Sequence, residues 1–457
     1  MMVEGDRNPA SAGKRRTPTI PHKAPADATG SLEASLEREH NPVKRFLKVL
    51  GPGLVTGASD DDPSGIGTYA VAGASLGFAT LWLALLTFPL MAAVQFTCAK
   101  ISMVTGRGLA GVLRQHYPRR LLYTAVFSLF VANTINAGAD IGAIAAAVNL
   151  LVPIPIVVLI IPIALSIVVL EVWGSYRLIA NTFRWLALTL LAYGAALFAR
   201  PDPLEVLRGT FIPTLSIDKM FFSTLVAILG TTISPYLFSW QSDQEVEEEI
   251  QMGRVTLRSR QGATDAELTY SAWDNNIGMG LSNLVMYFII LTTAATLFKS
   301  GQTNIQSAAD AAKALEPLAG PAAKVLLAVG LIGAGFLAVP ILTGSAAYAV
   351  AQALGWKFGL SRKPGRAKPF YGVIVMSTLV GILINFLGIN PIEALFWTAV
   401  LNGLLAPPLL VLIMLTANSK RVMGKHTNGR WTNLLGWGAT AAMFAAAGGL
   451  VLTWSQA

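Results

Sequence analysis

The chain has 457 residues, of which 53% are apolar and 13% are charged, whereas a soluble domain has about 25% charged residues. This composition excludes an ordinary soluble protein and predicts one that crosses a membrane several times. The surplus of 34 Lys and Arg over 25 Asp and Glu does not indicate nucleic-acid binding, because the basic residues lie in short segments between apolar runs. The single cysteine, Cys98, excludes an intramolecular disulfide.

The first 42 residues are rich in Pro, Ala, Ser and charge, which is typical of a solvated tail. No apolar segment follows the basic triplet at 14–16, so we expect no cleaved signal peptide and a tail that stays in the cytoplasm.

Eleven apolar runs after the tail are long enough to form membrane-spanning helices. They lie at 46–74, 78–104, 121–150, 154–171, 183–199, 221–241, 278–298, 323–353, 371–388, 391–416 and 433–454. The loops near 107–120, 357–368 and 420–430 are basic, whereas those near 151–155 and 388–392 contain no Lys or Arg. This alternation predicts an inner-membrane protein with a cytoplasmic N-terminus and an external C-terminus.

The segment 243–274 departs from this pattern because it is acidic. Acidic residues have little influence on topology, so the predicted orientation is unchanged. We expect the cluster to be a solvated face rather than an ion-binding vestibule. Its members are Asp243, Glu245, Glu247, Glu248, Glu249, Asp265, Glu267 and Asp274.

Two of the runs are interrupted by a proline beside polar residues. In the first run, Asp60, Asp61 and Asp62 precede Pro63. Three aspartates on an unbroken lipid-facing helix would cost roughly 7 to 10 kcal/mol, so we expect a broken helix whose acids face a wet, protein-lined site. The sixth run is broken in the same way at Ser234-Pro235.

The two breaks fall in the first helix of each of two sets of five. Interrupted helices at matching positions are typical of the substrate site of an inverted-repeat transporter, although Pro235 taken alone would be read as a kink. We read Pro340, which has few polar neighbours, as a kink. The predicted organisation is a tail at 1–42, five-helix repeats at 43–200 and 201–416, and a loop with an eleventh helix at 417–457.

The residues at the breaks have the chemistry of a metal site. Each proline lacks an N–H group, which frees the backbone carbonyls of Ser59 and Thr231 four residues earlier. With the Asp62 carboxylate, the Ser234 hydroxyl and water, these carbonyls would form an all-oxygen site for Mg²⁺, Mn²⁺ or Ca²⁺. Asp62 directly precedes the breaking proline and is the expected ligand, while Asp60 and Asp61 would add outer charge or cap the break.

The third run carries Asn136 and Asp140 at a spacing that places them on one face of a helix. Asp140 is a candidate for an ion or proton path, and a hydrogen bond to a neighbouring helix is an equally good interpretation. We expect no histidine proton relay, because all four histidines lie in the tail or in loops, at His22, His40, His116 and His426.

Three motifs resemble the Nramp family of divalent-metal transporters: Gly51-Pro52-Gly53, Thr105-Gly106-Arg107-Gly108-Leu109, and the segment from Gly230 to Pro235. The resemblance covers nearly the whole chain after the tail. It implies an all-α LeuT-like fold of two inverted five-helix repeats plus an eleventh helix, with alternating access around a midplane metal site.

The resemblance also implies roles for single residues. Asp62 matches the family's metal-binding aspartate, and Ser59 and Thr231 match its carbonyl ligands. Gly65 stands where the family has an asparagine ligand, and Ser234 stands where it has a methionine.

Other residues match family positions that are implicated in proton transfer. Tyr236 and Gln241 occupy the positions of two family histidines, and Asp140 matches a third-helix acid implicated in proton transfer. Loss of the methionine thioether removes the soft ligand and favours hard ions. The chain therefore resembles divergent relatives that carry Mg²⁺ without proton coupling.

The leading interpretation is a carrier of Mg²⁺ or Mn²⁺ that needs no cofactor and that interacts with the lipid bilayer but not with nucleic acid. The sequence is compatible with a monomer. One alternative is a sodium-coupled symporter of a small solute, although three acids beside the break disfavour an anionic substrate. Another is a non-transporting sensor or scaffold that signals through the tail and segment 243–274. An enzyme is not expected, since no span contains a histidine or a nucleophile–base pair.

Overall fold

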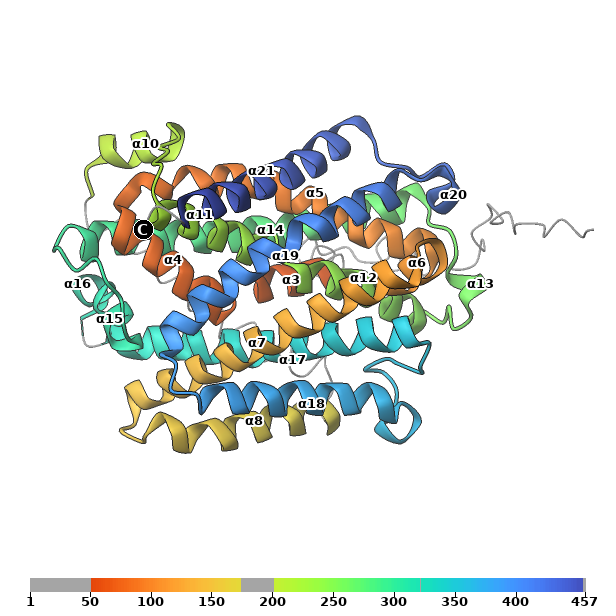
Figure 1. Cartoon of the computed structure of the whole chain (residues 1–457), viewed down its shortest axis with the longest axis horizontal. Coiled ribbons are helices and arrows are strands. Elements are labelled where there is room, and N and C mark those ends of the chain that lie inside the picture. Colours follow the sequence, from red (N-terminus) through yellow and green to blue (C-terminus); the bar gives the residue numbers. More distant parts are fainter. Residues whose placement is uncertain (1–50, 174–200, 321, 455–457) are drawn as a thin grey trace, which may run out of the picture.

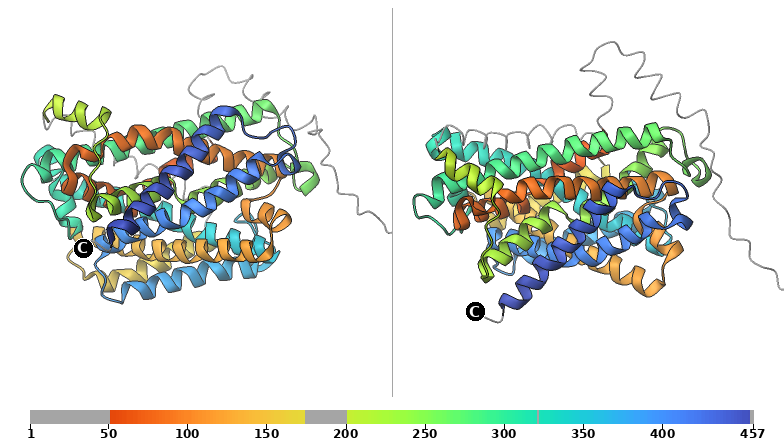
Figure 2. Two further views of the ribbon diagram at one scale, coloured as in Figure 1. Left: turned by 45° about the horizontal axis from the view of Figure 1, so that its top comes forward. Right: turned by 90° about the horizontal axis from the view of Figure 1, so that it is seen from above.

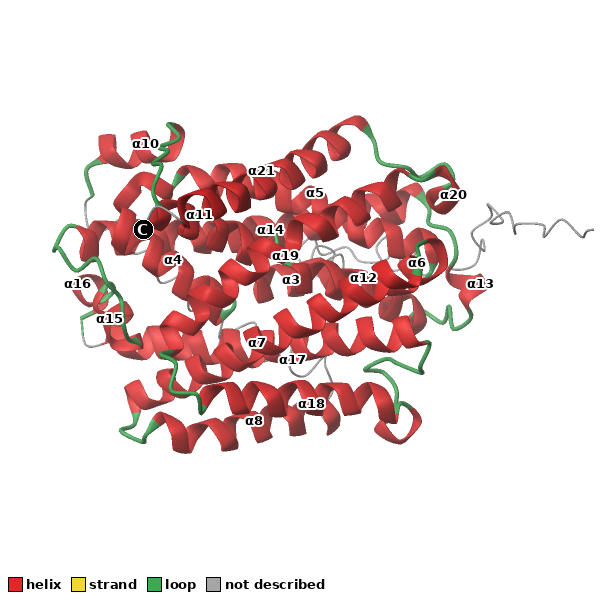
Figure 3. Ribbon diagram, viewed as in Figure 1, coloured by secondary structure: helices red, strands yellow, loops and turns green. Residues whose placement is uncertain are grey.

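The computed structural model describes residues 51–173, 201–320 and 322–454, and all regular elements in these ranges are helices (Figures 1 and 3). The tail at 1–42 and the fifth apolar run at 183–199 lie outside the described residues. The other ten expected runs all correspond to helices. In the described residues, nine helical segments are long and apolar enough to cross a membrane; one of them is the interrupted segment Lys219–Gln251, and the first run is divided into two shorter helices.

The two predicted breaks are present and lie in the middle of the molecule (Figure 1). The first run forms α3 (Pro52–Asp60) and α4 (Pro63–Leu76), and the sixth forms α11 (Lys219–Thr232) and α12 (Pro235–Gln251). In each case a proline occupies the first position of the second half-helix, where its missing N–H group is not needed.

The remaining spans are continuous helices. They are α5 (Trp82–Thr105), α7 (Arg119–Leu151), α8 (Ile156–Trp173), α14 (Asp265–Thr293), α17 (Ala322–Leu354), α18 (Lys368–Asn385), α19 (Pro391–Asn418) and α21 (Arg430–Trp454). Short elements join them: η1 (Gly77–Thr80), α6 (Leu109–His116), α10 (Pro203–Phe211), α13 (Leu257–Arg260), the π-helical turn η3 (Ala294–Phe298), α15 (Ala308–Lys313), α16 (Glu316–Ala319), η4 (Pro364–Arg366) and α20 (Lys420–Met423). Helix α17 continues through Pro340 without a break.

Helices at equivalent places in the two sets pack against each other. The second helix of the first set, α5, contacts α14; the third, α7, contacts α17; and the fourth, α8, contacts α18. Figure 2 shows α7, α8, α17 and α18 gathered on one side of the broken helices, with α5 and α14 on the other. This pairing agrees with a two-fold relation between the two sets.

Several helices approach closely through glycine. A β-carbon on Gly57 of α3 would lie 2.6 Å from the Cα atom of Gly278 on α14, and one on Gly138 of α7 would lie 2.8 Å from the carbonyl oxygen of Gly381 on α18. Between membrane helices the hydrophobic effect is absent, so close packing and polar contacts hold such pairs together. Large apolar side chains such as Phe127 and Leu165 remain exposed, as expected for surfaces that face lipid.

Most of the acidic cluster is not the solvated face that the sequence predicts, although Asp265 is exposed. Helix α12 continues to Gln251, and its acids Asp243, Glu245, Glu247 and Glu249 are all buried. Residues two apart on a helix point about 200° away from each other, so these acids occupy two opposite faces. One face packs on α17 and the other faces α3 and α14.

Candidate metal site at the two helix breaks

Asp62 is the N-terminal cap of α4, and hydrogen bonds from two helices hold its carboxylate. Its Oδ1 atom accepts from the Gly65 N–H at 2.6 Å and from the Ser64 hydroxyl at 2.8 Å. Its Oδ2 atom accepts from Nδ2 of Asn136 on α7 at 3.0 Å. Asp62 is completely buried, so this carboxylate is fixed in direction and removed from bulk water.

The second break lies directly against the first. The Tyr236 hydroxyl donates to the Ser59 carbonyl at 2.8 Å, and Ser345 of α17 donates to the Tyr236 carbonyl at 3.1 Å. A β-carbon on Gly65 would lie 3.1 Å from both the Asp60 carbonyl oxygen and the Thr231 hydroxyl oxygen. The glycine therefore leaves space where oxygen atoms from both breaks converge.

Several oxygen atoms around the breaks are buried without a hydrogen-bond partner among the described residues. They are Asp60 Oδ1, Thr231 Oγ1, Ser234 Oγ, Asn136 Oδ1 and both carboxylate oxygens of Asp140. Buried polar atoms normally have partners, and leaving them without one is costly. Each of these atoms can act as an acceptor, so a hard cation with its water molecules would satisfy them.

Asp60 and Asp61 are oriented by α14. The Ser282 hydroxyl lies 2.5 Å from Oδ2 of Asp60 and 3.2 Å from Oδ1 of Asp61. One hydroxyl group has one proton and cannot satisfy both carboxylates at once. The Ser282 hydroxyl therefore holds the two side chains next to each other beside the break, and a role for them around an ion stays a prediction. Nothing in the sequence around Ser282 indicated this contact, because it lies in an ordinary apolar run.

The sequence of this chain is similar to those of known membrane transporters. The model of the family described as Nramp, natural resistance-associated macrophage protein-like, matches residues 53–453. This chain belongs to the Nramp family. The divalent metal cation transporter MntH of Klebsiella pneumoniae is 27% identical over 427 residues, which cover 92% of this chain and 97% of that protein.

Two solved structures resemble the Nramp fold of this chain. The Eremococcus coleocola manganese transporter, in complex with an aromatic bis-isothiourea substituted compound, matches with a TM-score of 0.72 at 19% identity, over 92% of this chain and 88% of that one. A nucleobase-cation-symport-1 family transporter matches with a TM-score of 0.51 at 14% identity, over 89% and 93% of the two chains. The fold is the predicted LeuT-like inverted repeat in an integral membrane protein.

The other predicted site residues of this Nramp protein lie at different distances from the carboxylate of Asp62. Asn136 touches it directly, which the sequence did not reveal. Asp140 lies one turn further along α7 and is fully buried. Gln241 makes its hydrogen bonds elsewhere: it accepts from Thr56 at 2.5 Å and donates to Glu245 at 2.9 Å. A role for Asp140 or Gln241 in an ion or proton path stays a prediction.

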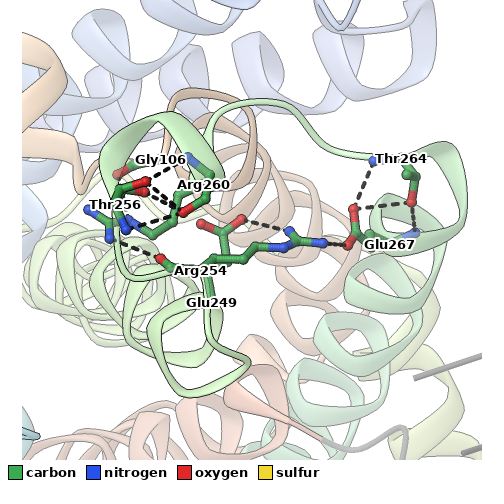
Figure 4. A network of polar contacts seen from close by, with 8 residues as sticks. Gly106, Glu249, Arg254, Thr256, Arg260, Thr264 and Glu267 are labelled. Carbon is green, nitrogen blue, oxygen red and sulfur yellow. Dashed lines mark hydrogen bonds and ion pairs between the residues drawn. The ribbon is translucent and has the colours of Figure 1, made fainter. Parts of the chain in front are cut away.

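The loop between α12 and α14 folds back on the Thr-Gly-Arg-Gly-Leu motif (Figure 4). Arg254 lies between two acids, pairing with Glu267 and lying 3.5 Å from Glu249. Arg260 donates to the Val255 carbonyl at 2.7 Å and to the Gly106 carbonyl at 3.4 Å. These contacts fix the end of α12 against the turn after α5.

This turn also contains a concentration of positive charge. Partial burial, and after it the neighbouring cations Arg260 and Arg114, lower the pKa of Arg107 below its usual value. The Thr-Gly-Arg-Gly-Leu motif therefore lies where the arginine side chains of three segments are close together.

Proposed function

We propose that this protein transports divalent metal cations by alternating access, with a substrate site formed by Asp62, Ser234 and the backbone carbonyls of Ser59 and Thr231. The observation that carries the proposal is the set of buried acceptor oxygens without partners where the two half-helix breaks meet. Family membership and the names of the relatives, a divalent metal cation transporter and a manganese transporter, support it.

The proposed substrate is a hard ion, Mg²⁺ or Mn²⁺, that keeps part of its water shell. The described residues contain no group of three or more His, Cys, Asp or Glu side chains arranged to hold a metal ion. A site made of one carboxylate, a hydroxyl group and two carbonyls leaves coordination positions for water, which Mg²⁺ gives up reluctantly. The negative ends of α3 and α11 point toward the breaks and add attraction for a cation.

Alternating access fits the burial of the site. Asp62, Ser59, Thr231 and Ser234 are each at most 1% exposed, so an ion there would be shielded from both membrane faces. We further propose the orientation that the basic loops predict, with the N-terminus in the cytoplasm and the C-terminus outside, and transport that does not depend on a histidine relay.

The direct test is ion flux into liposomes that contain the purified protein. We expect uptake of Mg²⁺ or Mn²⁺, and we expect Asp62→Ala to abolish it, because this variant removes the carboxylate that Gly65, Ser64 and Asn136 hold in a fixed direction at the break. Asp265→Ala is a suitable control, since the Asp265 side chain is 90% exposed at the start of α14. Flux that persists in Asp62→Ala would refute the site assignment.

A further inference from the structure

The N-terminus of α3 is held by a carboxylate from a distant helix. Asp274 of α14 accepts three backbone N–H groups: Gly51 at 2.9 Å and Leu54 at 3.2 Å on Oδ1, and Gly53 at 2.6 Å on Oδ2. The first N–H groups of a helix have no partner within the helix and are normally capped by a neighbouring residue in sequence. Here the cap is more than two hundred residues away, so it also ties two helices together.

Tight packing accompanies this tie. A β-carbon on Gly53 would lie 2.7 Å from the Asn275 backbone nitrogen, and Gly57 meets Gly278 one turn further along both helices. No side chain separates α3 from α14 at these positions. The seam between the two helices, which we define by Gly53, Gly57, Asp274, Asn275 and Gly278, is therefore packed backbone against backbone at its glycines.

A polar strip leads along this seam from the candidate metal site. Thr56 lies one turn before Asp60 and donates to Gln241, which donates to Glu245. Ser271 of α14 also donates to Glu245, at 3.1 Å. Gln241, Glu245 and Glu249 follow each other at four-residue spacing and share one face of α12.

The strip ends in a small cavity beside the α3 N-terminus. The cavity has a volume of about 70 Å³, and its lining includes Pro52, Glu245, Glu248, Glu249, Ser271 and Asp274. The strip thus runs from beside the candidate site to this cavity, and the carboxylates at its outer end would attract a cation. Helix α3 lies against α14 alongside the strip and leaves no room for a side chain between them.

We propose that Asp274 is a latch that holds the N-terminus of α3 against α14 and so keeps this seam closed on the side that the basic loops predict to be cytoplasmic. The proposal rests on the proposed transport function and on the predicted orientation. Helix α3 ends at Asp60, beside the candidate site, so release of its N-terminus from Asp274 would move the Ser59 carbonyl and open the polar strip at the same time. Asp274 is a positioning residue in this proposal, and it does not touch the ion.

The test measures access to the seam rather than flux. A cysteine in place of Asn275, which is fully buried opposite Gly53, reports on the seam when vesicles of known orientation are treated with a membrane-impermeant thiol reagent. We expect Asp274→Ala to raise the labelling rate of this reporter at least about tenfold from the cytoplasmic face alone, because three charge-assisted hydrogen bonds are lost. Asp274→Asn should have a smaller effect, since its remaining oxygen can still accept from Gly51 and Leu54.

Two controls keep the result interpretable. The native Cys98 is buried in α5, so it must stay unreactive in Asp274→Ala without the reporter; labelling of Cys98 would mean general unfolding. In that case the milder Thr56→Val, which removes the hydrogen bonds of the Thr56 hydroxyl to Gln241 and to the Pro52 carbonyl and leaves Asp274 in place, decides by the same reporter whether loosening α3 exposes the seam. Asp265→Ala, an exposed acid on the same helix, should leave the rate unchanged.

An unchanged rate in Asp274→Ala, an equal rise with Asp265→Ala, or a rise from both membrane faces would overturn the latch. The readout needs no metal flux, so it separates the two proposals. If Asp274→Ala raises the labelling rate but the wild-type protein carries no metal, the latch proposal stands and the transport proposal fails. If the wild-type protein carries metal but Asp274→Ala leaves the labelling rate unchanged, only the latch proposal fails.

Discussion

Asn136 should control how tightly Asp62 holds an ion, although it carries no charge. Its Nδ2 atom donates to the Asp62 carboxylate at 3.0 Å inside a fully buried site. A hydrogen bond to a charged group contributes about 1.5–3 kcal/mol. Loss of a residue that orients a metal ligand typically weakens metal binding about 10–100-fold, which corresponds to about 1.4–2.8 kcal/mol. The free energy of the hydrogen bond and that of the expected loss in metal affinity agree. Asn136→Leu should therefore weaken binding of Mg²⁺ or Mn²⁺ about 10–100-fold.

Titration calorimetry on the detergent-solubilised protein measures this affinity directly. Asn133→Leu is the matched control, because Asn133 lies one turn earlier on α7 and donates to the Leu342 carbonyl at 3.2 Å instead of to Asp62. Both variants lose one buried hydrogen bond, so both should lose similar stability, and Asn136→Leu alone should lose affinity. An affinity within about threefold of the wild type in Asn136→Leu, or an equal loss in both variants, would refute the reasoning.

Two further predictions concern ion choice and packing. Ser234→Met should raise the preference for Mn²⁺ or Cd²⁺ over Mg²⁺ in competition flux assays, because a thioether is a soft ligand, and an unchanged ranking would mean that this position does not touch the ion. Gly278→Val should destabilise the protein by about 1–3 kcal/mol in thermal unfolding, because its β-carbon would lie 2.8 Å from the Gly53 carbonyl carbon. Gly280→Val, whose β-carbon would approach only the flexible Phe88 ring at 3.4 Å, should cost much less; equal losses would argue against the α3–α14 packing.

The acidic segment shows where sequence reasoning went wrong. The apolar run ends near residue 241, so the sequence predicts a solvated face for the acids that follow. Helix α12 instead continues to Gln251 because each acid finds a partner, as Asp243 does in Gln352 and Glu247 in Tyr348. The two-residue spacing of Asp243, Glu245, Glu247 and Glu249 was a usable signal, since a helix cannot present such a pattern on one solvated face.

The sequence by itself determined the features that depend on local chemistry. A proline lacks an N–H group, and at Pro63 and Pro235 it directly follows a polar residue in an apolar run, so both breaks and the spans around them could be predicted. The cost of three aspartates in lipid likewise requires a protected site at Asp60 to Asp62, whichever helices surround them.

The tertiary structure alone decided how the acids at the first break are held. Asn136 reaches Asp62 across 74 residues of sequence, the Tyr236 hydroxyl reaches the Ser59 carbonyl across 177, and Ser282 reaches Asp60 across 222. No local pattern encodes these contacts, because each depends on which helices pack side by side and on their rotation. The three aspartates require a protected polar site, and the packing of α7, α12 and α14 decides which groups surround them.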